Sequence, residues 1–448
     1  MMLLAAALGL IQDFEVTPER LDALVKEVRP LVERSTGHAF KEEPKLVISE
    51  ADEVRKILVT ELTPQMKLQL PDGSADDHRK AAGEMAEQFT KILLGKYAAA
   101  TNSIHVIPGN FKRLAERYKR PRINSADYLR VIAIHELVHA IDEQAYRAMS
   151  RIADVKSAEE LVVWNAVIEG HAQHVTRAIL VAEKRGDLFR DFEEQISAMP
   201  PGTSEGEKAL ASQQAMYVKF GYIDGRAFFE GLAATGRKTY VEDVFAKPPA
   251  TKDVILHPAR YYDPKARPAA RDLKPLWDAL RKDFDGWSTD TPSIGEFELR
   301  SAIGDFVERK ALDAAMARLV GGGALSATPK DAPGSKMVVV LVSQSESGEA
   351  ASALHDLFEA TLKSKDERMK EGAIRITKAE YGTLKTKGGW RTTLARKTIV
   401  AAGQEVPVVD ALVTVGDFTV EVLYSNEGIA DDEMSKRVQS IAEWLERK

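Results

Sequence analysis

Two histidines and a glutamate form the short motif with the clearest chemical meaning in this sequence. His135 and His139 are four residues apart, and Glu136 directly follows the first of them. Residues i and i+4 share one face of an α-helix, so both imidazoles can bind one metal ion while Glu136 reaches the same site. A carboxylate placed there can take a proton from a water molecule at the metal. The motif therefore predicts a metal site that activates water.

The composition limits the ligands and partners of such a site. The 448 residues include no cysteine, which excludes disulfides, thiolate nucleophiles and cysteine-held metals. Any metal must be held by His, Asp or Glu, and Zn²⁺ is the ion expected for this motif. The net charge of −6 supplies no field that would attract a nucleic-acid backbone. We therefore expect no nucleic-acid partner.

The third protein ligand must come from another part of the chain. A hydrolytic zinc site uses three protein ligands and keeps one position open. One longer zinc motif would continue with Gly at position 142 and His at position 145, but this chain has Asp142 and Ala145. That continuation is therefore excluded.

Two long helices are expected to supply the ligands. Apolar spacing predicts helices over Ala126–Met149 and Ala158–Lys184, and their short connection makes them antiparallel neighbours. The second helix carries Glu169, His171 and His174. Since Glu169 and His171 face roughly opposite sides of this helix, only one of them can face the metal.

Elements around these helices are also readable from the sequence. We expect a helix over Thr17–Arg34, a strand over Pro44–Ser49 and a β-hairpin over Gly95–Ile107. Gly170 lies inside the second long helix, where glycine costs up to about 1 kcal/mol relative to alanine. This glycine indicates that another backbone segment approaches closely.

The combination of motifs resembles the gluzincin-type zinc metallopeptidases, and specifically little-characterised bacterial members of that group. The shared segments are His135-Glu136-Leu137-Val138-His139-Ala140 and Glu169-Gly170-His171-Ala172. The resemblance covers roughly residues 40–300. The sequence departs from the group's pattern at Asp142, Glu143 and His171.

The resemblance implies the roles of four residues. His135, His139 and Glu169 would be the zinc ligands, and Glu136 would be the general base. Catalysis in such a site usually needs one more hydrogen-bond donor for the developing oxyanion. His257, Tyr261 and Tyr262 are our candidates for this donor. His257, which precedes Pro258, is the first of them, although it could instead buttress the turn that Pro258 fixes.

The fold class that we expect is α+β, with a mostly helical zincin-like catalytic domain and a smaller C-terminal α/β module. Residues 13–290 would form the catalytic domain, and residues 291–336 a helical connector with a Gly-rich loop at Gly321–Gly323. Residues 337–448 would form the module, with one sheet covered by two helices. Its single histidine, His355, is expected on a helix surface.

The N-terminus leaves the cellular location open. Residues 1–12 carry no charge and include an apolar run, which could be a secretory signal or the start of a helix. A secreted or periplasmic location and a cytoplasmic one are both compatible with this segment. No apolar run in the sequence is long enough for a membrane span.

Two functions from different classes fit these observations. The first is zinc-dependent hydrolysis of a peptide bond in a peptide or protein substrate. The alternative is a zinc-stabilised binding or scaffold protein with little or no catalytic activity. Glu136 favours hydrolysis, because a purely structural metal site needs no base. Cleavage specificity and oligomeric state are not encoded in these motifs.

Overall fold

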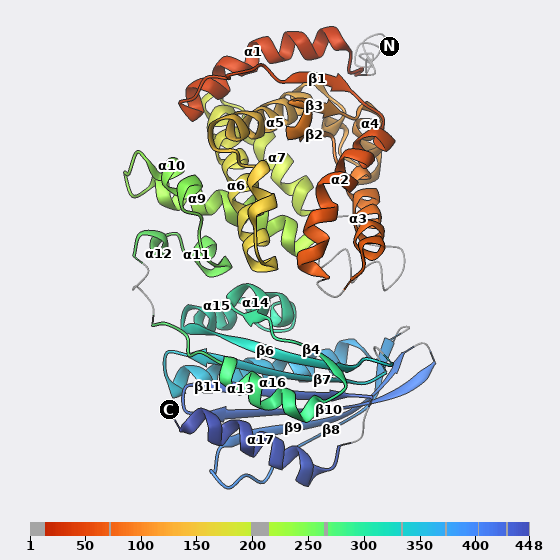
Figure 1. The fold of residues 1–448 in the computed structure, drawn as a ribbon, viewed down its shortest axis with the longest axis vertical. Helices are drawn as coiled ribbons and strands as arrows, with labels where there is room; N and C mark the ends of the chain where they lie inside the picture. Colours follow the sequence, from red (N-terminus) through yellow and green to blue (C-terminus); the bar gives the residue numbers. More distant parts are fainter. Residues whose placement is uncertain are drawn as a thin grey trace, which may run out of the picture. The chain divides into compact units, whose positions relative to one another are not determined.

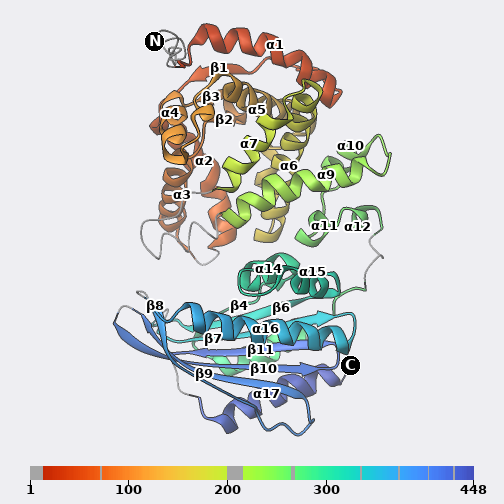
Figure 2. The same ribbon diagram turned by 180° about the vertical axis from the view of Figure 1, so that it is seen from behind.

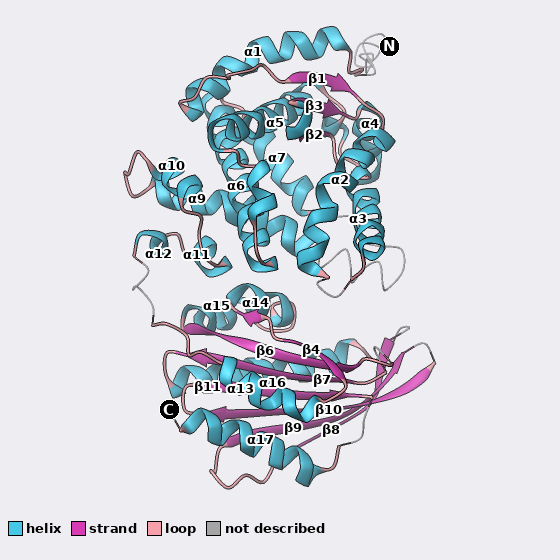
Figure 3. Ribbon diagram, in the orientation of Figure 1, coloured by secondary structure: helices cyan, strands magenta, loops and turns pink. Residues whose placement is uncertain are grey.

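The chain folds into two compact units, residues 1–261 and residues 262–448 (Figure 1). The computed structural model describes residues 14–70, 73–198, 215–263, 268–332, 335–371, 374–401, 403–426 and 429–447. The apolar segment at residues 1–12 lies outside the described residues. The first unit is mainly helical and the second contains a large sheet (Figure 3), which confirms the predicted α+β class.

Helices dominate the first unit. The longer ones are α1 (Pro18–Thr36), α2 (Ala51–Gln69), α3 (Ala75–Thr90), α4 (Pro108–Tyr118), α5 (Ala126–Tyr146), α6 (Ala158–Ala182) and α7 (Gly186–Ser197). The shorter ones are α9 (Gly225–Ala233), α10 (Tyr240–Ala246), α11 (Lys252–Leu256) and α12 (Ala259–Tyr262). Helix α1 begins at the N-cap Thr17, as its sequence predicts.

A three-stranded sheet packs beside α5. Its order is β1 (Lys45–Ile48), β3 (Ser103–Val106) and β2 (Gly95–Ala98), with β1 parallel and β2 antiparallel to β3. The predicted strand and hairpin are both present. Strand β2 is at an edge of this sheet and contacts α5 directly.

Helices α5 and α6 are antiparallel neighbours, as predicted. Serine side chains cap both N-termini, and every residue of α5 from Tyr128 to Asp142 is buried. The Trp164 indole of α6 donates to the carbonyl of Ala148, which lies just beyond α5, over 2.8 Å. Arg130 near the start of α5 pairs with Glu183 at the end of α6. These contacts fix the register that brings the two ligand-bearing segments together.

Gly170 provides the close approach that its sequence position predicts. A Cβ atom at position 170 would lie 2.3 Å from the backbone carbon of Gly225. A Cβ atom at position 225 would in turn lie 2.3 Å from the carbonyl oxygen of Ala166. The two glycines therefore let α9 and the preceding π-helical turn η4 (Phe220–Asp224) pack directly on α6.

The second unit is built on an eight-stranded sheet. Its main path runs β4 (Trp287–Asp290), β6 (Leu319–Pro329), β7 (Met337–Ser345), β11 (Phe418–Ser425), β10 (Gln404–Val415), β9 (Arg391–Ala401) and β8 (Ile374–Gly382), and β5 (Ser293–Ile294) pairs with β6. Helices α13 (Lys274–Leu280) and α17 (Asp431–Glu446) pack on one face. Helices α14 (Glu296–Ile303), α15 (Arg309–Ala317) and α16 (Gly348–Arg368) pack on the other face, where α16 lies over the strands (Figure 2).

Two expectations for this region differ from the structure. The division falls after Tyr261 rather than near residue 290, and Gly321–Gly323 lies within strand β6 instead of forming a loop. The glycine run belongs to a strand because β7 pairs along it; a Cβ atom at Gly322 would lie 2.1 Å from the carbonyl oxygen of Val342. The residues expected to form a helical connector therefore belong to the second unit, as helices α14 and α15 and strands β5 and β6.

His355 is buried rather than on a helix surface. Its two ring nitrogens lie 2.9 Å from the Thr414 hydroxyl and 3.0 Å from the Thr393 hydroxyl, and the residue has no exposed surface. Burial lowers the pKa of His355 to about 4. The histidine is thus a neutral core residue between α16 and the sheet, and the helical pattern alone could not reveal that both sides of α16 are covered.

Across the parts of the chain that the structure describes, no helix has the length and apolar character needed to cross a membrane.

Candidate metal centre

Three side chains from α5 and α6 converge on one point. The Nε2 atoms of His135 and His139 lie 3.1 Å apart, and Glu169 Oε2 lies 3.2 Å from the first and 3.4 Å from the second. A tetrahedral zinc ion with bonds of about 2.0–2.1 Å separates its ligand atoms by about 3.3 Å. The three ligand atoms therefore have the spacing of a metal site, and these residues could hold a metal ion.

The charges at this point suit a cation. Burial alone would lower the pKa of His139, but the Glu169 carboxylate raises it above its usual value. Burial would likewise raise the pKa of Glu169, but the two imidazoles hold it far below its usual range. Glu169 is therefore an anion beside two ring nitrogens, a donor set that zinc accepts.

Glu136 is held by the main chain of the neighbouring hairpin. Its Oε2 accepts a hydrogen bond from the Tyr97 backbone N–H over 2.6 Å. Gly95 allows this approach, since a Cβ atom there would lie 2.5 Å from Ile132 and 3.3 Å from Glu136 Cγ. The carboxylate of Glu136 is not part of the three-residue ligand group. The hydrogen bond from β2 therefore holds the Glu136 carboxylate outside the candidate ligand group.

Tyr222 is a residue of this site that the sequence analysis missed. Its ring is stacked on His135, with centroids 5.7 Å apart and planes 10° from parallel. Its hydroxyl interacts with the Glu169 carboxylate, and burial, with the Glu169 charge, raises the pKa of Tyr222 well above its usual value. Apolar spacing over this segment predicts an ordinary helix and does not reveal the π-helical turn η4. Gly221 and Gly225, on either side of Tyr222, were the available signal for a close approach.

The other two histidines of α6 have different partners. His171 Nδ1 lies 2.7 Å from Asp142 Oδ2, and both side chains are buried. His174 Nε2 lies 2.9 Å from the Tyr240 hydroxyl, and burial lowers the pKa of His174 to about 4. Neither histidine joins His135 and His139, so the geometry favours Glu169 as the third ligand.

The structure does not bring His257 into the ligand group. His257 follows the last residue of α11, and its Nε2 lies 4.0 Å from Asp253 Oδ1. The following Pro258 packs against Gly231, where a Cβ atom would lie 2.7 Å from the proline ring. The Tyr261 hydroxyl donates to the Lys247 carbonyl oxygen over 2.7 Å. This arrangement matches the alternative that His257 belongs to a structural turn.

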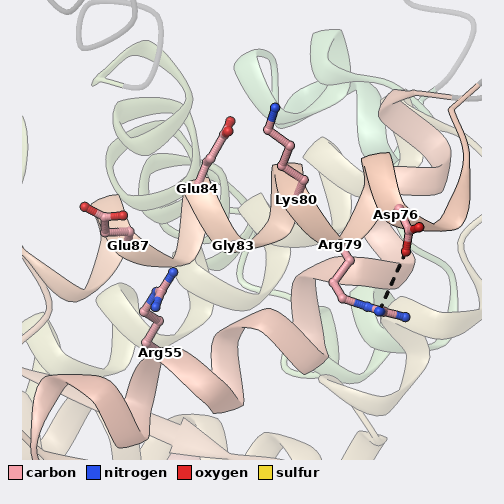
Figure 4. Close-up of a pocket in the computed structure, with 7 residues that line it drawn as sticks. All are labelled: Arg55, Asp76, Arg79, Lys80, Gly83, Glu84 and Glu87. Carbon is pink, nitrogen blue, oxygen red and sulfur yellow. Dashed lines mark ion pairs between the residues drawn. The ribbon is translucent and has the colours of Figure 1, made fainter.

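A separate polar pocket of about 440 Å³ lies along α2 and α3 (Figure 4). Its lining residues are Arg55, Asp76, Arg79, Lys80, Gly83, Glu84 and Glu87. The side chains of Arg79 and Asp76, 3.8 Å apart, are 70% and 93% exposed. The pocket is therefore a solvated helix surface, and we assign it no function.

Comparisons with known proteins add little to this geometry. No protein-family model matches the sequence, and no curated protein matches it. One solved structure, described as "a putative hydrolase with a novel fold from Chloroflexus aurantiacus", is similar with a TM-score of 0.40 and 17% sequence identity. The match covers 56% of this chain and 90% of that chain. A likeness of this size carries no argument about function, so the site itself must supply one.

Proposed function

We propose that this protein is a zinc-dependent, gluzincin-like metallopeptidase. The observation that carries the proposal is the convergence of His135, His139 and Glu169 at ligand spacing, with Glu136 beside them and outside the ligand set. A bound zinc ion would polarise the substrate carbonyl and make a neighbouring water easier to deprotonate. A purely structural site would have no need of Glu136.

The residues of the chain divide the remaining work. Glu136 takes the proton from the attacking water and later delivers it to the leaving amine. The Tyr97 N–H fixes one carboxylate oxygen of Glu136, so the other oxygen is the one available for proton transfer. The rigid α5 keeps Glu136 and both histidines in one register because it is buried along its whole middle section.

The test is cleavage of an unbiased peptide library by the zinc-loaded protein, read out by mass spectrometry and compared with Glu136→Gln. We expect Glu136→Gln to keep its zinc and to lose hydrolysis by about 10²–10⁴-fold, since the base is not a ligand. Full activity in Glu136→Gln would contradict the mechanism. A wild-type protein that binds zinc and cleaves no peptide would support the binding or scaffold alternative instead.

A further inference from the structure

Tyr222 reaches the metal centre from a third segment of the chain. It lies in η4, a five-residue π-helical turn, and such turns are rare and frequently mark functional sites. Gly221 brings this turn against the metal ligand, since a Cβ atom at 221 would lie 3.8 Å from Glu169 Cβ. The contact between Gly225 and Gly170 holds α9, which directly follows η4, against α6.

The side chain of Tyr222 contacts two of the three ligand residues in two different ways. Its ring is stacked parallel to the His135 imidazole, with centroids 5.7 Å apart, and its hydroxyl interacts with the Glu169 carboxylate. His135 belongs to α5 and Glu169 to α6, so one side chain bridges both ligand-bearing helices. Phe192 of α7 also meets the His135 ring, edge-on at 6.1 Å, but it has no polar group to offer.

The second ring nitrogens of the two imidazoles have no hydrogen-bond partner among the protein residues that the structure describes. A metal-bound histidine almost always donates its second ring nitrogen to a carboxylate, carbonyl or water, which fixes the ring. Among the described residues, Nδ1 of His135 and Nδ1 of His139 are buried with no hydrogen-bond partner. The stacked contact with Tyr222 can supply the orientation that this missing hydrogen bond would otherwise give to His135.

We propose that Tyr222 is a positioning residue that clamps His135 and Glu169 into ligand geometry and thereby sets the affinity of the centre for its metal. The inference rests on the proposed metal site and goes beyond it. The hydroxyl orients the carboxylate, and the ring orients the imidazole. Removing the hydroxyl alone and removing the whole ring must therefore weaken metal binding in two separable steps.

The experiment measures zinc affinity by competition with a chelator for the full-length wild type, Tyr222→Phe, Tyr222→Leu and the control Phe192→Leu. Loss of a group that orients a ligand typically weakens metal binding 10–100-fold. We expect about 10-fold weaker binding in Tyr222→Phe, a further loss in Tyr222→Leu, and little change in Phe192→Leu. Thermal melting of the metal-free proteins identifies any variant that fails to fold.

Each possible result either supports or overturns the role proposed for Tyr222. Wild-type affinity in Tyr222→Phe and Tyr222→Leu would overturn the inference, as would an equal loss in Tyr222→Leu and Phe192→Leu, which would indicate packing alone. Should Tyr222→Leu not fold, the comparison of Tyr222→Phe with the wild type decides. A folded wild type that binds no zinc would remove the proposed metal centre itself, which is a different failure from a zinc-binding protein indifferent to Tyr222.

Discussion

Glu169 and His171 are two residues apart on α6, yet their side chains have different surroundings. Glu169 faces the two motif histidines, whereas His171 is buried against Asp142. We expect Glu169→Ala to lose most of its zinc, because one of three ligands is gone. We expect His171→Ala to keep its zinc but to lower the free energy of unfolding by about 1–3 kcal/mol, since it leaves a buried Asp142 oxygen without its partner.

Metal analysis of the purified variants, together with denaturant unfolding, measures both effects. His174→Ala is the control, because His174 lies on the same helix and has a tyrosine partner instead of a carboxylate. Loss of zinc in His171→Ala with retention in Glu169→Ala would reverse the ligand assignment.

Among the site residues predicted from the sequence, His257, the expected oxyanion donor, has the least support from the geometry. If the role holds, His257→Ala keeps its zinc and turns over about a hundredfold more slowly. If His257 instead buttresses the turn before Pro258, the same variant has a lower melting temperature and unchanged turnover per folded molecule. Steady-state kinetics on a cleaved library peptide, normalised to the folded fraction, separates the two outcomes.

The contact between α6 and α9 gives a prediction at the level of elements. In Gly170→Ala the new Cβ would lie 2.3 Å from the Gly225 backbone, so the two segments must separate. We expect a loss of about 1–3 kcal/mol in the free energy of unfolding, typical of overpacking. Zinc affinity should fall as well, because η4 and its Tyr222 move with α9.

A second helical glycine is the matched control for this change. Gly83 lies inside α3, and a Cβ atom there would have no atom within 4 Å. Gly83→Ala should therefore raise stability by about 0.4–1 kcal/mol, through the lower entropy of the unfolded chain. Equal effects at the two glycines, measured by urea unfolding, would contradict the role assigned to Gly170.

Strands β10 and β11 of the second unit contain two interacting carboxyl groups, those of the buried Asp410 and the partly buried Glu421. Asp410 and Glu421 interact with each other, and burial raises the pKa of both above the ordinary values of 3.8 and 4.5. Lys397 is engaged by Asp366 over 2.6 Å, and Lys365 lowers the pKa of both carboxyls only in part. A raised folded-state pKa gives stability that is complete below the ordinary values and is lost as the pH rises through the folded one.

Asp410→Asn should therefore make the second unit more stable than the wild type at neutral and alkaline pH, with a difference that disappears towards pH 4. The amide stays neutral at every pH, so the folded protein no longer has to bury a charge at position 410. Thermal melts across this pH range provide the measurement, and Asp432→Asn, at a side chain that is 74% exposed, is the control. If the melting temperatures of Asp410→Asn and the wild type depend on pH in the same way, the carboxyl pair does not affect stability.

Local spacing predicted the elements that carry the ligands but not the segment that completes the site. The i, i+4 rule and the antiparallel pairing of α5 and α6 both follow from short-range patterns. The π-helical turn η4 and the burial of His355 depend on which other elements pack on a helix. The helical spacing of apolar residues does not show which elements these are. For the same reason Gly170 indicated a close approach without naming Gly225 as the partner.

The division of the chain after Tyr261 gives a prediction for the whole molecule. The expected ligands, Glu136, the β2 backbone and Tyr222 all belong to the first unit. A fragment ending at Asp263 should therefore be soluble and bind zinc with an affinity close to that of the full chain. A fragment ending at Gly322 would cut strand β6 and leave its remainder without β7, so it should aggregate.

Size-exclusion chromatography and zinc titration of both fragments measure these outcomes. An insoluble or metal-free fragment ending at Asp263 would show that the second unit is needed for the metal site to form. The sequence alone placed the boundary near residue 290 and a loop at Gly321–Gly323, whereas here these glycines are part of a paired strand.

The hydrogen bond from the β2 main chain to Glu136 limits which amino acids related sequences can have at two positions of β2. The donor is a main-chain amide, so any residue except proline at position 97 supplies the same hydrogen bond. Position 95 is different, because every side chain there would collide with Ile132. In the evolutionary record of related sequences, the catalytic constraint should therefore be visible as an invariant glycine two residues before the donor, while the donor position itself drifts among residues that fill the same buried space.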